Sequence, residues 1–129
     1  MASGRALLEH GLQGLCIFDI VPRLETSKGA IQALAQDFPL AKIVTKAVDV
    51  RYEKSVKDAV DATVDALGGV DILLCFAEIA RTYPAMEMTP EQWHEILDIN
   101  ATGCFLTSKH VAKYVADNSE SVAQNVSRG

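Results

Sequence analysis

Three short aliphatic runs constrain this chain more than any other feature of its sequence. They lie at Leu15–Ile20, Lys42–Val48 and Val70–Phe76, and they are rich in the aliphatic and β-branched residues that a sheet covered on both faces buries. Between them, apolar residues recur at helical spacing over 24–38 and 56–67. Because strands that alternate with helices are typical of parallel sheets, the sequence predicts an α/β fold with three visible strands and crossover helices.

Glycines and a change of composition mark the expected boundaries. Residues 5–10 read as the end of a helix that Gly11 stops, and Gly68 ends the helix before the third run. From residue 116 onward the chain is polar, with few bulky apolar side chains. We therefore predict one partial domain over residues 1–115 and a polar, disordered tail over 116–129.

The clearest start signal belongs to a fourth helix. Thr89 is a favoured N-cap residue, Pro90 suits the first helical position, and Gln92 completes a capping box. An apolar stripe then continues to about Tyr114. The sequence therefore predicts one long helix that ends near the start of the polar tail.

The charge balance argues against a nucleic-acid partner. The 129 residues carry 12 Lys and Arg against 17 Asp and Glu, so the net charge is -5, and no long basic run occurs. The 49% hydrophobic content is that of a globular domain, and the three cysteines, an odd set without a C-x-x-C pair, fit reduced thiols. Neither the cysteines nor the three histidines have metal-ligand spacing, so no metal site is expected.

The N-terminal sequence and the lengths of the apolar runs point away from membranes. Arg5 and Glu9 interrupt the first apolar stretch too early for a signal peptide. The longest apolar run, 72–77, is far shorter than the roughly 20 residues that span a bilayer. We therefore expect a soluble, cytoplasmic protein with no membrane partner.

Acidic residues close two of the predicted strands. A dinucleotide can bind at the carboxyl ends of such strands, because the helix N-termini and the open crevice there accept its pyrophosphate and riboses. Asp19 can accept both ribose hydroxyls of NAD and would repel the extra phosphate of NADP, or it can be a solvated loop residue. Asp49 and the N–H of Val50 can face an adenine edge, or Asp49 can be the N-cap of the following helix. The sequence leaves both pairs of alternatives open.

Five segments occur in a characteristic order. They are Ala6–Gly11, Phe18–Asp19, Asp49–Arg51, Gly69–Leu73 and Asp98–Phe105. In this order and spacing the chain closely resembles the short-chain dehydrogenase/reductase family, in particular the polyol and keto-reductase-like members common in fungi. The resemblance covers most of the chain. It implies a partial Rossmann-type, doubly wound parallel sheet, the cofactor NAD(P)(H), and hydride exchange in a small-molecule carbonyl/alcohol pair such as a polyol, a sugar or a secondary-metabolite ketone.

The resemblance also implies roles for individual residues. Asp19 matches the position that selects the adenosine ribose, which favours NAD(H), and Asp49 with Val50 matches the pair that faces the adenine. Asn100 matches the Asn of the catalytic tetrad, which holds a water in the proton relay; otherwise it is a tolerated polar residue in a helix. Lys109 falls near a basic residue assigned to the cofactor site in some fungal members, although a lysine on a solvated helix face is the commoner explanation.

The sequence departs from the family pattern at three places. The family opens with a strand and a T-G-x-x-x-G-x-G loop that holds the pyrophosphate, and this chain has no such loop. Where the family has Asn-Asn-Ala-Gly, this chain has Cys75–Glu78, so that Glu78 adds bulk and charge. The catalytic Tyr-x-x-x-Lys is also absent. We therefore expect oxidoreductase activity to be impaired in this chain as it stands.

A non-catalytic interaction module is the alternative function. Missing strands leave a sheet edge unpaired, and unpaired edges recruit partners. In the family the fourth helix commonly packs across a subunit interface, and here Cys104, Leu106 and Val111 give it an apolar face. This alternative predicts a homo-oligomer, or pairing with a full-length relative.

Overall fold

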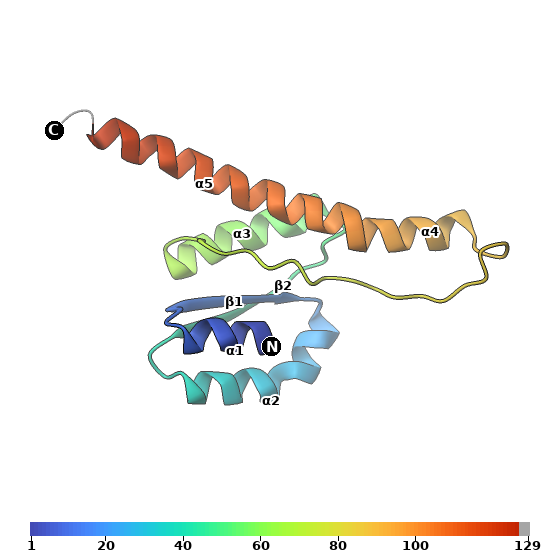
Figure 1. Cartoon of the computed structure of the whole chain (residues 1–129), viewed down its shortest axis with the longest axis horizontal. Coiled ribbons are helices and arrows are strands. Elements are labelled where there is room, and N and C mark those ends of the chain that lie inside the picture. Colours follow the sequence, from blue (N-terminus) through green and yellow to red (C-terminus); the bar gives the residue numbers. More distant parts are fainter. Residues whose placement is uncertain (127–129) are drawn as a thin grey trace.

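The structure is a computed structural model that describes the backbone of residues 1–126 and the side chains of residues 1–117. Two strands lie between two layers of helices (Figure 1). The elements in chain order are α1 (Ala2–Glu9), β1 (Gly14–Asp19), α2 (Val21–Asp37), β2 (Lys42–Ala47), α3 (Glu53–Leu67), α4 (Pro90–Leu97), the π-helical turn η1 (Asp98–Gly103) and α5 (Cys104–Val126). The helices α1 and α2 lie on one side of the sheet, and α3 and α5 lie on the other (Figure 1).

The sheet consists of β1 and β2, which pair in parallel. The register runs from Gly14 opposite Lys42 to Asp19 opposite Ala47, so the carboxyl ends of the two strands lie at the same edge. A parallel pair needs a crossover connection, and α2 supplies it. The strand bounds agree with the first two aliphatic runs to within one residue, which confirms a partial α/β fold with a parallel sheet.

The prediction of a third strand is wrong. Residues 70–76 are extended but belong to no strand, so the sheet has two strands where the sequence predicted three. A strand exists only where a neighbour completes its hydrogen-bond ladder. A cavity of about 1590 Å³, lined by both β1 and residues 70–79, separates this segment from the nearest free sheet edge. The aliphatic run therefore has the composition of a buried strand without the partner that would make it one.

The predicted helix ends are confirmed where glycines or caps set them. Gly11 and Gly68 have φ angles of 93° and 84°, the left-handed conformation that ends a helix and that other residues rarely adopt. At the start of α4 the Thr89 hydroxyl accepts a bond from the Gln92 N–H at 3.3 Å, and the Gln92 side chain accepts one from the Thr89 N–H at 3.0 Å. Both halves of the predicted capping box are therefore present.

The long fourth helix differs from its prediction in two respects. The π-helical turn η1 divides it into α4 and α5, and α5 continues beyond Tyr114 to Val126. The predicted tail of 116–129 therefore overlaps the end of α5, and its last three residues lie outside the described residues. No helix within residues 1–126 combines the length and the apolar character required to cross a bilayer.

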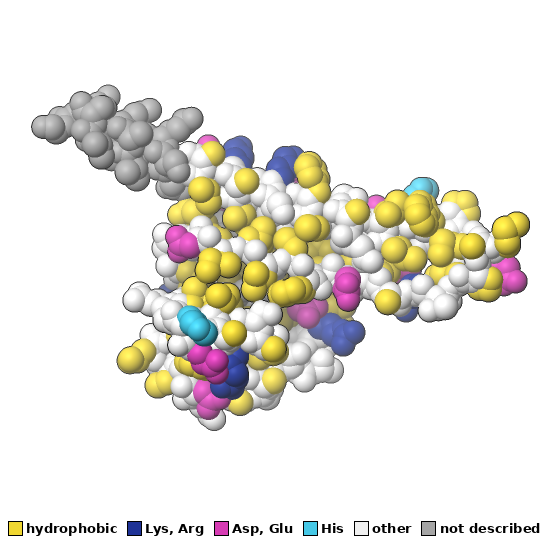
Figure 2. Space-filling view, in the orientation of Figure 1, with side chains coloured by type: hydrophobic (Ala, Val, Ile, Leu, Met, Phe, Trp, Pro, Cys, Tyr) yellow, Lys and Arg dark blue, Asp and Glu magenta, His cyan; other side chains and the backbone are white. Residues whose placement is uncertain are grey.

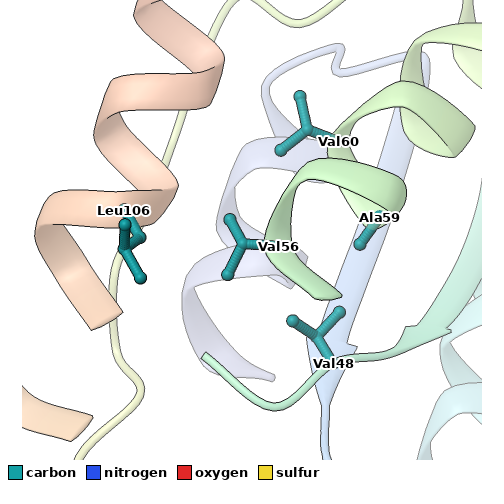
Figure 3. Close-up of a cluster of buried hydrophobic side chains, with 5 residues drawn as sticks. All are labelled: Val48, Val56, Ala59, Val60 and Leu106. Carbon is teal, nitrogen blue, oxygen red and sulfur yellow. The ribbon is translucent and has the colours of Figure 1, made fainter. Parts of the chain in front are cut away.

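The core lies between the sheet, α3 and α5. Val56, Ala59 and Val60 of α3 are buried against Val48, which follows β2, and Leu106 of α5 (Figure 3). This apolar stripe of α3 has the i, i+3, i+4 spacing of one helix face. The cluster therefore holds α5 against α3, and α3 against the sheet.

One glycine permits a close approach that positions η1. A Cβ atom on Gly103 would lie 2.6 Å from Cγ2 of Val50, which is too close for any real contact. The side chain of Val50 therefore packs directly on the backbone of the π-helical turn. This contact brings the loop after β2 and the helical turn that carries Asn100 together.

Truncation of the core should measure how much of the fold depends on the α3 cluster. We expect Val56→Ala to lower the free energy of unfolding by about 2 kcal/mol, because the side chain is fully buried and its lost methyl groups leave a cavity. The matched control is Val21→Ala. This substitution should lower the free energy of unfolding only slightly, because the Val21 side chain is 58% exposed. Urea denaturation followed by circular dichroism gives both values, and equal losses in the two variants would contradict this assignment of the core.

Candidate functional site

The candidate site lies at the carboxyl ends of β1 and β2. Because the strands are parallel and in register, the residues that follow them meet at one edge of the sheet. This edge opens into the cavity of about 1590 Å³, and Asp19, Asp49 and Val50 all line it. The extended segment 70–79 forms the opposite wall, which includes Glu78. The structure therefore brings three of the five sequence-predicted site residues to one cavity.

Asp19 ends β1, and a single residue, Ile20, separates it from α2. Its backbone carbonyl accepts a hydrogen bond from the Val48 N–H at 2.9 Å, which completes the ladder, and its carboxylate Oδ1 accepts the Ile20 N–H at 2.8 Å. The residue is exposed at the mouth of the cavity, close to the positive end of the α2 dipole. A carboxylate in this place can accept hydrogen bonds from the hydroxyl groups of a ligand.

Asp49 is bound to Arg51. The guanidinium donates to both carboxylate oxygens, at 2.9 Å from Nε and 2.5 Å from Nη2, and the Arg51 N–H donates to Oδ1 at 3.1 Å. The pKa of Asp49 lies below its ordinary value, mainly because the Arg51 guanidinium donates hydrogen bonds to the carboxylate. The hydrogen bond from the Arg51 N–H lowers it further. The alternative of Asp49 as an N-cap is wrong, because Tyr52 occupies the N-cap position of α3 and no side chain caps that helix.

Val50 lines the cavity, and its side chain is partly buried against the core. The side chain contacts the buried cluster and the backbone of Gly103. Within residues 1–126 the structure shows no hydrogen bond donated by the Val50 N–H. The donor therefore remains available to an acceptor on a ligand, such as a ring nitrogen of adenine.

The Asn100 side chain links the helical turn η1 to the extended segment 70–79 by hydrogen bonds. Its Oδ1 accepts the Ile79 N–H at 2.8 Å, and its Nδ2 donates to the Ile79 carbonyl at 2.9 Å. The side-chain amide thus pairs with a backbone peptide group as a neighbouring strand would. A π-helical turn is a common feature of functional sites, and here it directs this amide at the cavity wall.

Lys109 lies outside the cavity in this structure. Its Nζ is 2.7 Å from Oε1 of Glu53, and Nε2 of His110 is 3.1 Å from the same oxygen. The hydrogen bond from Lys109, followed by that from His110, lowers the pKa of Glu53. This cluster joins the first turn of α3 to α5. The role of Lys109 at a cofactor stays a prediction.

The cavity wall carries more acidic than basic side chains. The acidic ones are Asp19, Asp49, Asp71, Glu78 and Glu95, and the basic ones are Arg23, Arg51 and Arg81. Two of the three arginines face a carboxylate, since Arg51 binds Asp49 and Arg81 lies 3.9 Å from Glu95. In the part of the chain that the structure describes, no three His, Cys, Asp or Glu side chains gather as metal ligands would.

Sequence reasoning missed Arg23 and Ile79. Arg23 lies in the first turn of α2, four residues after Asp19, and lines the same cavity. Its spacing from the strand end is the signal that could have identified it. Ile79 contributes through its backbone, which no sequence pattern reports.

Comparisons with known proteins agree with this geometry. The family model described as enoyl-(acyl carrier protein) reductase matches residues 2–128. The chain is 35% identical over 128 residues to a short-chain dehydrogenase/reductase, eriH, of Hericium erinaceus, covering 87% of this chain and 50% of that protein. It is 30% identical over 105 residues to a 3alpha-hydroxysteroid dehydrogenase of Mediterraneibacter gnavus, covering 81% of this chain and 42% of that protein. The chain thus spans half or less of the length of these relatives.

Solved structures show the same fold. A dehydrogenase/reductase of Sinorhizobium meliloti superimposes with a TM-score of 0.72 at 23% identity, covering 78% of this chain and 39% of that one. A short-chain dehydrogenase of Mycobacterium smegmatis gives a TM-score of 0.69 at 24% identity, covering 77% and 40%. The ordered motifs, the parallel sheet, and the family match over residues 2–128 lead to one conclusion: the chain belongs to the short-chain dehydrogenase/reductase family.

Proposed function

We propose that this chain is the adenosine-binding part of an NAD(H)-dependent oxidoreductase that acts on a small-molecule carbonyl/alcohol pair, such as a polyol, a sugar or a secondary-metabolite ketone. The observation that carries the proposal is the meeting of Asp19, Asp49 and Val50 around one cavity at the carboxyl edge of the sheet. The relatives named as dehydrogenases support the reaction class. Cytoplasmic localisation is proposed with it.

The residues present fit the adenosine half of a dinucleotide. The Asp19 carboxylate would accept the two ribose hydroxyls, and the Val50 N–H would donate to the adenine edge. Asp49, whose charge Arg51 balances, would flank the base. Asn100 would act on the nicotinamide side by fixing the backbone of Ile79.

The residues present do not fit the diphosphate or the proton transfer. The 129 residues hold no T-G-x-x-x-G-x-G loop and no Tyr-x-x-x-Lys, and an acidic cavity wall disfavours phosphate. The bound nicotinamide would supply or accept hydride, but none of the site residues can supply the proton of the reaction. We propose that this chain alone binds cofactor weakly and turns over no carbonyl substrate.

A second candidate function is self-association, or pairing with a full-length relative. The observation in its favour is the exposure of three large apolar side chains on one extended segment: Ile72 is 50% exposed, Leu74 46% and Phe76 69%. Contiguous apolar surface of this kind marks interaction sites. Saturable NADH binding would favour the first candidate, whereas its absence together with concentration-dependent association in light scattering would favour the second.

Substitution at Asp19 should change cofactor preference. For the unmodified chain we expect nicotinamide fluorescence titrations to show tighter binding of NADH than of NADPH. Asp19→Asn should weaken NADH binding by about tenfold, since a charged hydrogen-bond acceptor is lost. The variant should also reduce the preference for NADH over NADPH, because Arg23 lines the same cavity and would attract the added phosphate of NADPH.

Asp65→Asn is the matched control for this titration. Asp65 is exposed on α3 and does not line the cavity, so the substitution removes the same charge at a distance from the site. If both variants lost the same affinity, the effect would come from net charge and the role of Asp19 would be wrong. NADPH binding equal to that of NADH in the unmodified chain would also contradict the assignment.

Removal of the Asn100 amide should release the cavity wall. We expect Asn100→Ala to accelerate amide hydrogen exchange at Ile79 by about tenfold, because the N–H loses its acceptor. Thr102→Ala, an exposed position in the same π-helical turn, should leave that exchange unchanged. Nuclear magnetic resonance measures both rates, and an unaltered Ile79 amide in the Asn100 variant would show that other contacts hold the segment.

A further inference from the structure

The fold brings together two cysteines that lie far apart in the sequence. Cys75 belongs to the extended segment 70–79, and its Sγ lies 4.0 Å from the Oγ of Ser108 on α5. Ser108 follows Cys104 by one helical turn, so these two side chains share one face of α5. The Cys75 thiol also interacts with the Cys104 thiol. Cys75 and Cys104 therefore form a pair of neighbouring thiols, with the Ser108 hydroxyl beside them.

The hydrogen bonds of Asn100 explain why the two thiols meet. These bonds, at 2.8 and 2.9 Å, join η1 to the peptide group of Ile79. Cys75 lies four residues before Ile79, and Cys104 lies four residues after Asn100. From this anchor α5 runs back along the extended segment (Figure 1). The two cysteines therefore lie on the same side of the anchor and face each other.

The Cys75 thiol is harder to ionise than an ordinary thiol. Partial burial raises its pKa, the interaction with Cys104 raises the pKa further, and the hydrogen bond with Ser108 lowers it. Figure 2 shows hydrophobic side chains gathered on the face between α5 and the region of α1, and such surroundings disfavour a thiolate. Both Cys75 and Cys104 are nevertheless exposed, so a small reagent can reach them.

The third cysteine has different surroundings. The Sγ of Cys16 accepts a hydrogen bond from the Thr63 hydroxyl at 3.2 Å, and the Cys16 side chain is partly buried. Burial is the main reason that the pKa of Cys16 is raised. Cys16 thus provides an internal control within the same chain, because its neighbour is a hydroxyl group instead of a second thiol.

We propose that Cys75 and Cys104 form a modification site, at which a small-molecule disulfide converts the two thiols into an intramolecular disulfide. The observation that carries the proposal is the meeting of the two side chains, together with Ser108, between the extended segment and α5. The inference goes beyond cofactor binding and does not depend on it, because thiol–disulfide exchange requires only the two cysteines and the reagent.

The exchange takes place in two steps. The Cys104 thiolate attacks one sulfur of the small disulfide, which forms a mixed disulfide and releases one thiolate. Cys75 then loses its proton to water and attacks the Sγ of Cys104, which forms the bond between the two cysteines and releases the second thiolate. The protein loses two electrons and two protons, and the small disulfide is reduced to two thiols. Cys75 acts second, because its raised pKa leaves less of it as thiolate.

The new bond changes how the cavity wall is held. It joins Cys75 covalently to the first residue of α5. The hydrogen bonds of Asn100 already hold the same segment at Ile79. Oxidation therefore fixes residues 75–79 at both ends, and these residues include Glu78 in the wall of the cavity.

Oxidised glutathione tests the proposal on the full chain. We expect the reduced chain, incubated with an excess of this reagent, to become lighter by two hydrogen atoms in intact-mass spectrometry. Peptide mapping should link Cys75 to Cys104 and leave Cys16 as a free thiol. The bond should also form about tenfold or more faster in the folded chain than in concentrated urea, because the folded chain has already brought the two thiols together.

Substitutions of single cysteines identify the two roles. Cys75→Ser should keep a stable glutathione adduct on Cys104, since the second thiol is lost, whereas Cys16→Ser should form the intramolecular disulfide as the unmodified chain does. Circular dichroism checks that each variant is folded. A linkage that includes Cys16, adducts on both Cys75 and Cys104 without a bond between them, or an equal rate in urea would overturn the proposal. A disulfide between two chains on a non-reducing gel, in place of the intramolecular bond, would overturn it as well.

Discussion

The parallel ladder between β1 and β2, held from one side by α3, is the constraint on which the rest of the structure depends. Val56 and Val60 of α3 pack with Val48 directly after β2, so burial of the helix fixes where the strand ends. Since the ladder is in register, fixing one carboxyl end fixes the other, and Asp19 is brought to the same edge as Asp49. The candidate site is therefore a consequence of core packing.

Much of the fold could be predicted because its signals are local. Positive φ at Gly11 and Gly68, the Thr89–Gln92 capping box, and the aliphatic runs of β1 and β2 each depend on a few neighbouring residues. Residues 70–76 show the limit of such signals. Their composition is that of a strand, but hydrogen bonds to a neighbouring backbone decide whether a strand forms, and no local pattern contains that neighbour.

The difference between local signals and contacts with distant residues also explains which parts of the candidate site could be predicted. Asp19 could be found from its place at the end of a strand, because the topology alone brings that residue to the edge of the sheet. The partners of Asp49 and Lys109 could not, since a side chain as long as arginine or lysine can reach several carboxylates, and only the packed structure selects Arg51 for one and Glu53 for the other. These are exposed or half-exposed pairs, so each contributes little to stability; their effect is to decide which charges face a ligand.

Backbone pairing, more than any side chain, sets how rigid the cavity can be. The wall 70–79 is held at its far end by the two hydrogen bonds of Asn100 to Ile79, whereas between Asp71 and Phe76 no ladder supports it. A ligand at the carboxyl edge would contact a wall anchored at one end, and ordering that wall would reduce its affinity.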